Sequence, residues 1–331
     1  MMQTNIDAKN ILLPSYRGRL LEGIKYNRAN NTLLWVDIIS AEIHRVCLDN
    51  EADLEASHEV LKFAEAGESI GAVLLTKDPD IVLACAKYGV ATASFKTKQF
   101  AYMVKYPLCA ESAASLRSND GLIDPWGNIW IGLMNDFPTV KAQGKVEPAG
   151  VLYRISAADL SVKTMVKDAY IPNGLAFSND GNSLFWTDSL TFTVWQFDYD
   201  HEHVTLKNKR PLLAIQPVYP GVSSPEPDGL SCTSQGDFYH AIFSTSSVLK
   251  YDSRGEVQQK LMVPAELVTC TGLGGAADDE LYITTGHQNL LDSGAEIDAL
   301  DKTGDLGGFL FRVKLGHKAH SQPAAVWGGQ I

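Results

Sequence analysis

The sequence lacks a stretch that could cross a membrane as a helix, since such a span needs about 20 consecutive apolar residues. The first ten residues, Met1 to Asn10, are polar and contain no apolar segment of the kind that a secretory signal requires. We therefore expect a cytoplasmic protein with no membrane partner.

Paired cysteines are also missing. The chain has five cysteines, an odd number, and no two of them form a C-x-x-C motif. Scattered cysteines of this kind favour free and mostly buried thiols in a reducing compartment rather than a disulfide framework or a zinc site. They are Cys47, Cys85, Cys109, Cys232 and Cys270.

Positive charge is scarce, because 28 Lys and Arg residues face 39 Asp and Glu residues and the formal net charge is -11. An acidic surface repels phosphate backbones and anionic lipids, so nucleic acid is excluded as an expected partner. The composition gives no indication of an oligomeric state.

Long amphipathic helical patterns are absent, and Ser57–Glu65 is the best short candidate for a helix. Short runs rich in Val, Ile, Tyr and Phe dominate instead, separated by turn clusters such as Asn179-Asp180-Gly181. This punctuation predicts an all-β fold. The clearest runs are Thr32–Ile38, Ala72–Leu75, Ile81–Ala84, Asn128–Gly132, Ser183–Thr187 and Glu280–Thr284.

A glycine followed by an apolar residue recurs at intervals of about 50 residues, which is the length of a four-stranded propeller blade. Six such repeats predict one six-bladed β-propeller domain over residues 1–331. The blades would span roughly 16–315, and the terminal segments would complete or decorate the ring. The repeats begin at Glu22-Gly23, Ile70-Gly71, Asp120-Gly121, Asn173-Gly174, Asp228-Gly229 and Thr271-Gly272.

The residue before each glycine is expected to face the central channel, and four of these six residues are Asp, Asn or Glu. Any single Asn-Gly or Asp-Gly pair would more often be a turn, but recurrence at blade spacing favours a ring of oxygen ligands. Such a ring suits one divalent cation and leaves positions open for water. The ligand types do not distinguish Ca²⁺, Mg²⁺, Mn²⁺, Fe²⁺ and Zn²⁺.

Several segments resemble the senescence-marker-protein/gluconolactonase (regucalcin-like) family, in family order across residues 21 to 315. The most specific is the R-x-N-D-G-x-x-D-P-x-G run that begins at Arg117. The matching segments are Leu21-Glu22-Gly23, Leu34-Trp35-Val36-Asp37-Ile38, residues 117–134, Ile171-Pro172-Asn173-Gly174-Leu175, Trp186-Thr187-Asp188-Ser189, Pro227-Asp228-Gly229-Leu230, Gly274-Gly275 and Leu281-Tyr282-Ile283-Thr284.

The resemblance implies a propeller that hydrolyses a sugar (aldono-) lactone to the aldonic acid with the help of one divalent metal. By position, Glu22, Asn173 and Asp228 look like the metal ligands, and Asp228 also looks like the general base that activates water. Arg117 and Asn119 look like residues that hold the substrate. Asp188 is expected to be structural, bonding the loop beneath the site.

The sequence departs from the family pattern at two places. Phe137 stands where regucalcin-type enzymes carry an acidic residue that touches substrate, which leaves the particular sugar and ring size open. The segment Val268-Thr269-Cys270-Thr271 replaces the usual Pro-Thr-Ser before the sixth blade's glycines. His287, after the last repeat, is a candidate substrate contact near the channel mouth.

Two other functions remain as alternatives. One is a propeller that hydrolyses phosphotriesters with the same metal site. The other is a non-catalytic propeller that binds proteins, because Trp35-Val36-Asp37 superficially resembles a WD dipeptide. The G-H partner of that motif is missing, and the repeats are longer than the ~45 residues that it requires.

Overall fold

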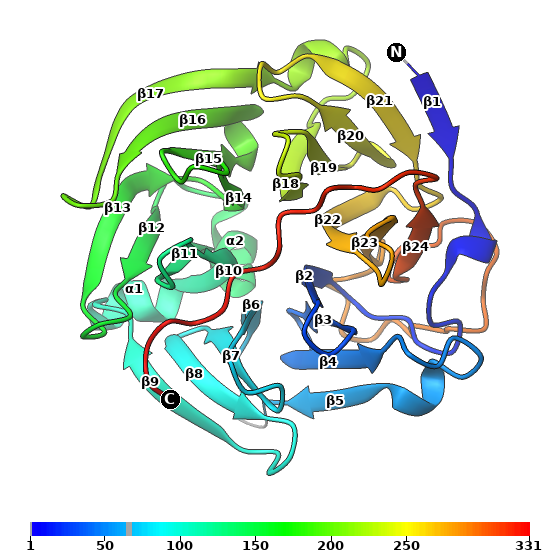
Figure 1. The fold of residues 1–331 in the computed structure, drawn as a ribbon, viewed down its shortest axis with the longest axis horizontal. Coiled ribbons are helices and arrows are strands. Elements are labelled where there is room, and N and C mark those ends of the chain that lie inside the picture. Colours follow the sequence, from blue (N-terminus) through cyan, green and yellow to red (C-terminus); the bar gives the residue numbers. More distant parts are fainter. Residues whose placement is uncertain (1, 64–67) are drawn as a thin grey trace.

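The computed structural model describes residues 2–63 and 68–331 of the chain. Six β-sheets stand around a central axis as the blades of a propeller (Figure 1). Within each blade, consecutive strands pair antiparallel from the centre outward. The predicted six-bladed β-propeller is therefore confirmed.

The strands follow one plan in every blade. The innermost strands are β2 (Leu21–Asn27), β6 (Ile70–Leu75), β10 (Leu116–Ile123), β14 (Pro172–Phe177), β18 (Glu226–Cys232) and β22 (Leu267–Gly274). The second strands are β3 (Thr32–Asp37), β7 (Ile81–Ala86), β11 (Ile129–Asn135), β15 (Ser183–Asp188), β19 (Phe238–Phe243) and β23 (Glu280–Gly286). The third strands are β4 (Glu42–Cys47), β8 (Gly89–Ser94), β12 (Gly150–Ile155), β16 (Thr193–Asp200), β20 (Ser247–Tyr251) and β24 (Phe311–Lys314). The outer strands of the first five blades are β5 (Glu59–Lys62), β9 (Phe100–Lys105), β13 (Val162–Ala169), β17 (Thr205–Ala214) and β21 (Val257–Met262).

The seams between blades form the hydrophobic core, because each sheet has to bury both of its faces. The strands β3 and β6 are buried along their whole length. Second strands supply large fillers to these seams: Trp35, Trp130 and Trp186 each have an exposed fraction of 1% or less. Packing blade against blade thus supplies the burial that no single sheet could achieve alone.

Each innermost strand carries a β-bulge, where its pairing register with the second strand shifts. A bulge adds an unpaired residue and redirects the side chains around it. In the first five blades the bulge lies at or beside the repeated glycine, as at Gly174. A Cβ atom at Gly174 would overlap the backbone oxygen of Asp228 in the next blade, so the close approach of the strands requires glycine.

The N-terminal segment closes the ring. The strand β1 (Met2–Asn5) pairs in parallel with β21 and gives the fifth blade a fifth strand. Beyond it, Ile11 bridges Phe311 and the Leu12 amide donates to the Leu310 carbonyl at 2.8 Å, so the segment lies along the outer side of β24. The chain then enters β2, and the first and last blades are joined by residues that precede the first repeat.

The C-terminal residues 321–327, which we call the C-terminal strap, cross the middle of the ring (Figure 1). At one end, Ser321 bridges Thr233 of the fifth blade. At the other end, Val326 bridges Leu75 of the second blade, and Trp327 is 1% exposed in a core cluster. Both terminal segments therefore tie together blades that are far apart in the sequence.

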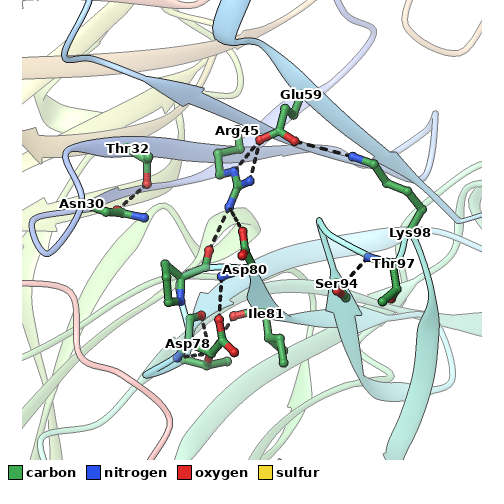
Figure 2. Close-up of polar contacts among 12 residues, drawn as sticks. Asn30, Thr32, Arg45, Glu59, Asp78, Asp80, Ile81, Ser94, Thr97 and Lys98 are labelled. Carbon is green, nitrogen blue, oxygen red and sulfur yellow. Dashed lines mark hydrogen bonds and ion pairs between the residues drawn. The ribbon is translucent and has the colours of Figure 1, made fainter.

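Polar contacts also join neighbouring blades, as Figure 2 shows for the first and second. The Arg45 guanidinium donates to Glu59 from Nε at 2.9 Å within its own blade. It reaches across the seam to the Pro79 carbonyl at 2.8 Å and the Asp80 carboxylate at 3.3 Å. Because only 12% of the Arg45 side chain is exposed, these bonds also satisfy a largely buried cation.

Helices are few and short. The helices α1 (Ala110–Ser115) and α2 (Phe137–Gln143) were not expected from the sequence, and no helix among residues 2–63 and 68–331 could cross a membrane. The expected helix Ser57–Glu65 is wrong, since Glu59–Lys62 form β5 and residues 64–65 lie outside the described residues. An outer strand with one exposed face alternates too weakly over four residues to be distinguished from a short helix.

The cysteines are all free. Cys85, Cys232 and Cys270 are buried, whereas Cys47 is half-buried and Cys109 is exposed. The prediction of free thiols is thus confirmed, and the prediction of burial holds for three of the five.

An aromatic stack holds the N-terminal segment against the first blade. Trp35, His44 and His58 lie face to face, with ring centroids 5.2 Å apart for Trp35–His44 and 5.3 Å apart for His44–His58. The His44 ring contacts the Tyr16 hydroxyl at 3.0 Å on one side and His58 Nε2 at 3.1 Å on the other. Burial, followed by the neighbouring His44, lowers the pKa of His58 to about 4.

We predict that this stack makes the fold less stable in acid. The folded state holds His58 neutral down to pH about 4, whereas the unfolded chain takes up the proton near pH 6.5. Stability should therefore be fully present above pH 6.5 and fall as the pH is lowered towards 4, although Glu42 and Glu55 oppose this effect. Melting temperatures across that range should fall less steeply for His58→Gln, whereas the exposed control His317→Asn should match the wild type.

Candidate functional site

Two carboxylates meet inside the channel at the beginning of the innermost strands. Glu22 on β2 and Asp228 on β18 are each 6% exposed. Burial, reinforced by the Asp120 carboxylate, raises the pKa of Glu22 to about 8. Burial and then the Glu22 carboxylate raise the pKa of Asp228 well above its ordinary value. Like charges held this close favour either a shared proton or a cation between them.

Asn173 on β14 is tied to the segment that carries Asp228 through a neighbouring serine. Its amide nitrogen donates to the Ser189 hydroxyl at 3.1 Å, and that hydroxyl donates to the Pro227 carbonyl at 2.8 Å, next to Asp228. This arrangement fixes the orientation of the Asn173 amide.

The predicted ligands fit a divalent cation. The Asn173 Oδ1 and Asp228 Oδ1 atoms are buried and have no hydrogen-bond partner among the described residues. Unsatisfied buried oxygens are costly, and a hard or borderline cation would satisfy both. No cluster of three His, Cys, Asp or Glu side chains within metal-binding reach occurs in the described part of the chain, so the amide of Asn173 is needed as the third donor.

Arg117 and Asn119 lie together on β10. The Arg117 Nη1 donates to the Asn119 Oδ1 and to the Ser118 carbonyl, both at 2.8 Å. The Asn119 nitrogen donates to the Pro172 carbonyl at 3.0 Å, so the amide holds the arginine and ties β10 to β14. The Arg117 Nε is buried and has no partner in the described structure, which leaves a donor for a ligand.

Arg117 is a buried cation whose charge interacts with three carboxylates. Burial lowers the pKa of Arg117 to about 10, although the carboxylates of Asp136, Glu22 and Asp228 oppose the shift. The guanidinium therefore stays charged at neutral pH. It attracts negative charge into a site whose carboxylates would otherwise repel it.

Phe137 lies against Arg117, with the guanidinium carbon 4.4 Å from the centre of the phenyl ring. It begins α2, whose cap is Asp136. The Asp136 carboxylate accepts the Phe137 amide at 2.8 Å and the Lys87 ammonium at 2.5 Å. The Asp136 carboxylate is thus engaged in hydrogen bonds within the fold. The next position places the apolar ring of Phe137 beside Arg117.

The sixth blade keeps the repeated glycine on its innermost strand, but its bulge lies elsewhere. Its bulge lies between Val268 and Cys270, so the unpaired residue is Thr269 rather than a neighbour of Gly272. Thr271 lines the channel further along, and its hydroxyl donates to the Tyr239 carbonyl at 2.6 Å. In this blade the repeated glycine, Gly272, therefore lies three residues beyond the bulge.

Two other predicted residues lie at the same end of the channel. The Asp188 carboxylate accepts the amides of Tyr170 and Ile171, the latter at 2.9 Å, which confirms its structural role in holding the entry to β14. His287 follows β23 and is 9% exposed; its Nδ1 accepts the Asn289 amide at 3.1 Å. A contact between His287 and a substrate stays a prediction.

His240, which no sequence pattern indicated, contacts the backbone of Asp228. This buried residue on β19 lies between the Asp228 carbonyl, 2.9 Å from its Nε2, and the Tyr251 hydroxyl, 2.9 Å from its Nδ1. Burial lowers the pKa of His240 to about 4, so the neutral ring donates from Nε2 and accepts at Nδ1. A lone histidine inside a strand cannot be assigned such partners before the blade is assembled.

Comparison with known proteins identifies the family and supports the fold. The family model described as SMP-30/Gluconolactonase/LRE-like region matches residues 20–287. The chain therefore belongs to the SMP-30/gluconolactonase/LRE-like family. It is 44% identical over 341 residues to the Cell growth-regulated gene 1 protein of Candida albicans, covering 100% of both chains.

A pentonolactonase of Haloferax volcanii is 29% identical over 297 residues, covering 89% of this chain and 90% of that protein. Among solved structures, a calcium-binding regucalcin from Agrobacterium tumefaciens superposes with a TM-score of 0.79 at 20% identity and covers 99% of both chains. The structural likeness supports the fold, and the relatives support lactonase chemistry at the level of the family.

We predict that His240 stabilises the bulge that presents Asp228. In the variant His240→Leu, the Asp228 carbonyl and the Tyr251 hydroxyl would be buried without partners, which should lower the free energy of unfolding by about 2–5 kcal/mol. The matched variant Tyr251→Phe removes one bond only and should cost about 1 kcal/mol. Urea denaturation measures both, and equal losses in the two variants would contradict the bridging role.

Proposed function

We propose that the chain hydrolyses a sugar lactone, with one divalent cation held by Glu22, Asn173 and Asp228. The observation that carries the proposal is that the buried atoms Asn173 Oδ1, Asp228 Oδ1 and Arg117 Nε have no hydrogen-bond partner among the described residues. When bound, such a cation supplies Lewis acidity to a carbonyl oxygen.

The side chains of the protein would divide the remaining work. Asp228 has a second carboxylate oxygen with which to accept a proton from the attacking water. Arg117 would donate hydrogen bonds to the carbonyl oxygen as negative charge develops on it. Asn119 holds that guanidinium in place and so limits the reorganisation needed during the reaction. The ring oxygen of the lactone then leaves as an alcohol, which gives the aldonic acid.

Burial of these side chains strengthens the electrostatic interactions that they make. All five side chains are at most 6% exposed, so their charges act through a medium of lower dielectric than water. A general base that also binds a cation is weakened by it, but a lactone is an activated ester and requires only a modest base. The names of the lactonase relatives support this substrate class.

The first test combines metal and substrate panels. Aldonolactones should be hydrolysed after a divalent metal is added and no longer hydrolysed after chelation. Asp228→Asn should lower kcat by about 100-fold or more, whereas Asp200→Asn, a matched change at the last residue of β16, should have no effect. Activity that survives both chelation and Asp228→Asn would refute the mechanism, and turnover of phosphotriesters alone would refute the substrate class.

A second prediction concerns Ser189, which orients the Asn173 amide. Ser189→Ala should weaken divalent-metal binding by about 10-fold, because a group that hydrogen-bonds to a metal ligand fixes the direction of that ligand. Thr191→Ala is the control, since the Thr191 hydroxyl in the same turn donates to the Asp188 carbonyl instead. Calorimetric titration with Ca²⁺ or Mn²⁺ measures the affinity. Equal affinities in the two variants would show that Asn173 is not positioned in this way.

A further inference from the structure

A second cavity lies in the channel beyond the candidate site, towards the carboxyl ends of the innermost strands. Its volume is about 260 Å³. None of the candidate ligands, nor Arg117 or Asn119, lines it. Every innermost strand contributes an aliphatic side chain, and together these form what we call the aliphatic collar: Ile24, Leu74, Leu122, Leu175, Leu230 and Leu273.

The C-terminal strap covers this cavity. Residues 321–325 form part of the lining and cross the end of the channel, as Figure 1 shows for the red segment. Hydrogen bonds hold the strap on both sides: the Gln322 amide donates to the Cys232 carbonyl at 3.1 Å, and the Trp327 amide donates to the Leu75 carbonyl at 2.9 Å. The strap therefore covers part of this cavity, which we call the compartment.

Two cationic side chains line the compartment, and only one of them has a hydrogen-bond partner among the described residues. Arg28 donates to the Asp278 carboxylate and to the Ser321 hydroxyl, both at 3.0 Å. Lys25 is half-buried and forms no hydrogen bond or ion pair with any described residue. Its charge acts on Asp120 and Glu22, so the side chain extends along the channel, yet neither carboxylate lies within ion-pair distance.

No described side chain neutralises the Lys25 ammonium, so an anion bound in the aliphatic collar would gain an opposite charge beside it. We propose that the compartment binds a small aliphatic monocarboxylate, whose anionic group pairs with Lys25 and whose hydrocarbon chain fills the collar. The volume allows this, because an apolar cavity of about 150 Å³ already accommodates benzene. A polyhydroxylated acid fits less well, since its hydroxyls would face leucine side chains.

The proposal is independent of the lactonase activity and is tested on the metal-loaded protein by calorimetric titration. Hexanoate and octanoate should bind, whereas hexanol, which has no charge, and hexylammonium, which has the wrong charge, should bind far more weakly. Lys25→Met should weaken hexanoate binding by about 10- to 100-fold. Lys25→Arg should retain most of it, and melting curves check that both variants fold.

A second variant guards against misfolding and against binding at the wrong place. Leu122→Phe keeps Lys25 but fills part of the collar, and should weaken octanoate more than hexanoate. Arg117→Met, in the candidate active site, should leave hexanoate binding unchanged. The proposal is overturned if hexanoate does not bind at millimolar concentration, if Lys25→Met binds it as well as the wild type, or if Arg117→Met or chelation abolishes binding.

Discussion

The convergence of six strands on one axis is the constraint on which the rest of the structure depends. Backbones that approach this closely leave no room for Cβ atoms, which is why Gly71, Gly174 and Gly229 each lie against the backbone or side chain of the next blade. The same convergence forces the ladder to bulge, and the bulges turn neighbouring side chains towards the axis. The spacing of the glycines, the number of blades and the polar side chains in the channel are therefore all linked to this convergence.

The channel also concentrates charge where water cannot screen it. Glu22, Asp120 and Asp228 bring three carboxylates to its interior, and the charges of Lys25 and Arg117 oppose that of Glu22. Burial raises the pKa of Asp120 as it does those of the other two, so the negative charge is held at a cost in stability. A fold retains such a cluster at a functional centre more readily than at a structural one. A divalent cation would offset the excess that remains.

Much of this arrangement could be predicted from the sequence, because it follows from period and local chemistry. Strand pattern and repeat length indicated the ring, and Asp188 was correctly placed beneath the site because an acidic residue after a strand commonly accepts nearby amides. The position of the bulge in the sixth blade could not be predicted, since Gly272 keeps the repeat spacing while the bulge lies three residues earlier, at Thr269. The roles of His240 and Ser189 depend on bonds between strands or turns that are distant in sequence.

The two ends of the channel differ because residues alternate along the innermost strands. Asp228 and Leu230 are two positions apart, yet a bulge separates them, and one carries charge at the candidate site while the other belongs to the aliphatic collar. In five blades, the residue two positions beyond the one before the repeated glycine is aliphatic and lines the cavity. The polar end suits an ester with many hydroxyls, and the apolar end suits hydrocarbon. Lys25 lies between them, so a partner bound to its ammonium would also alter the field that Glu22 and Asp120 experience.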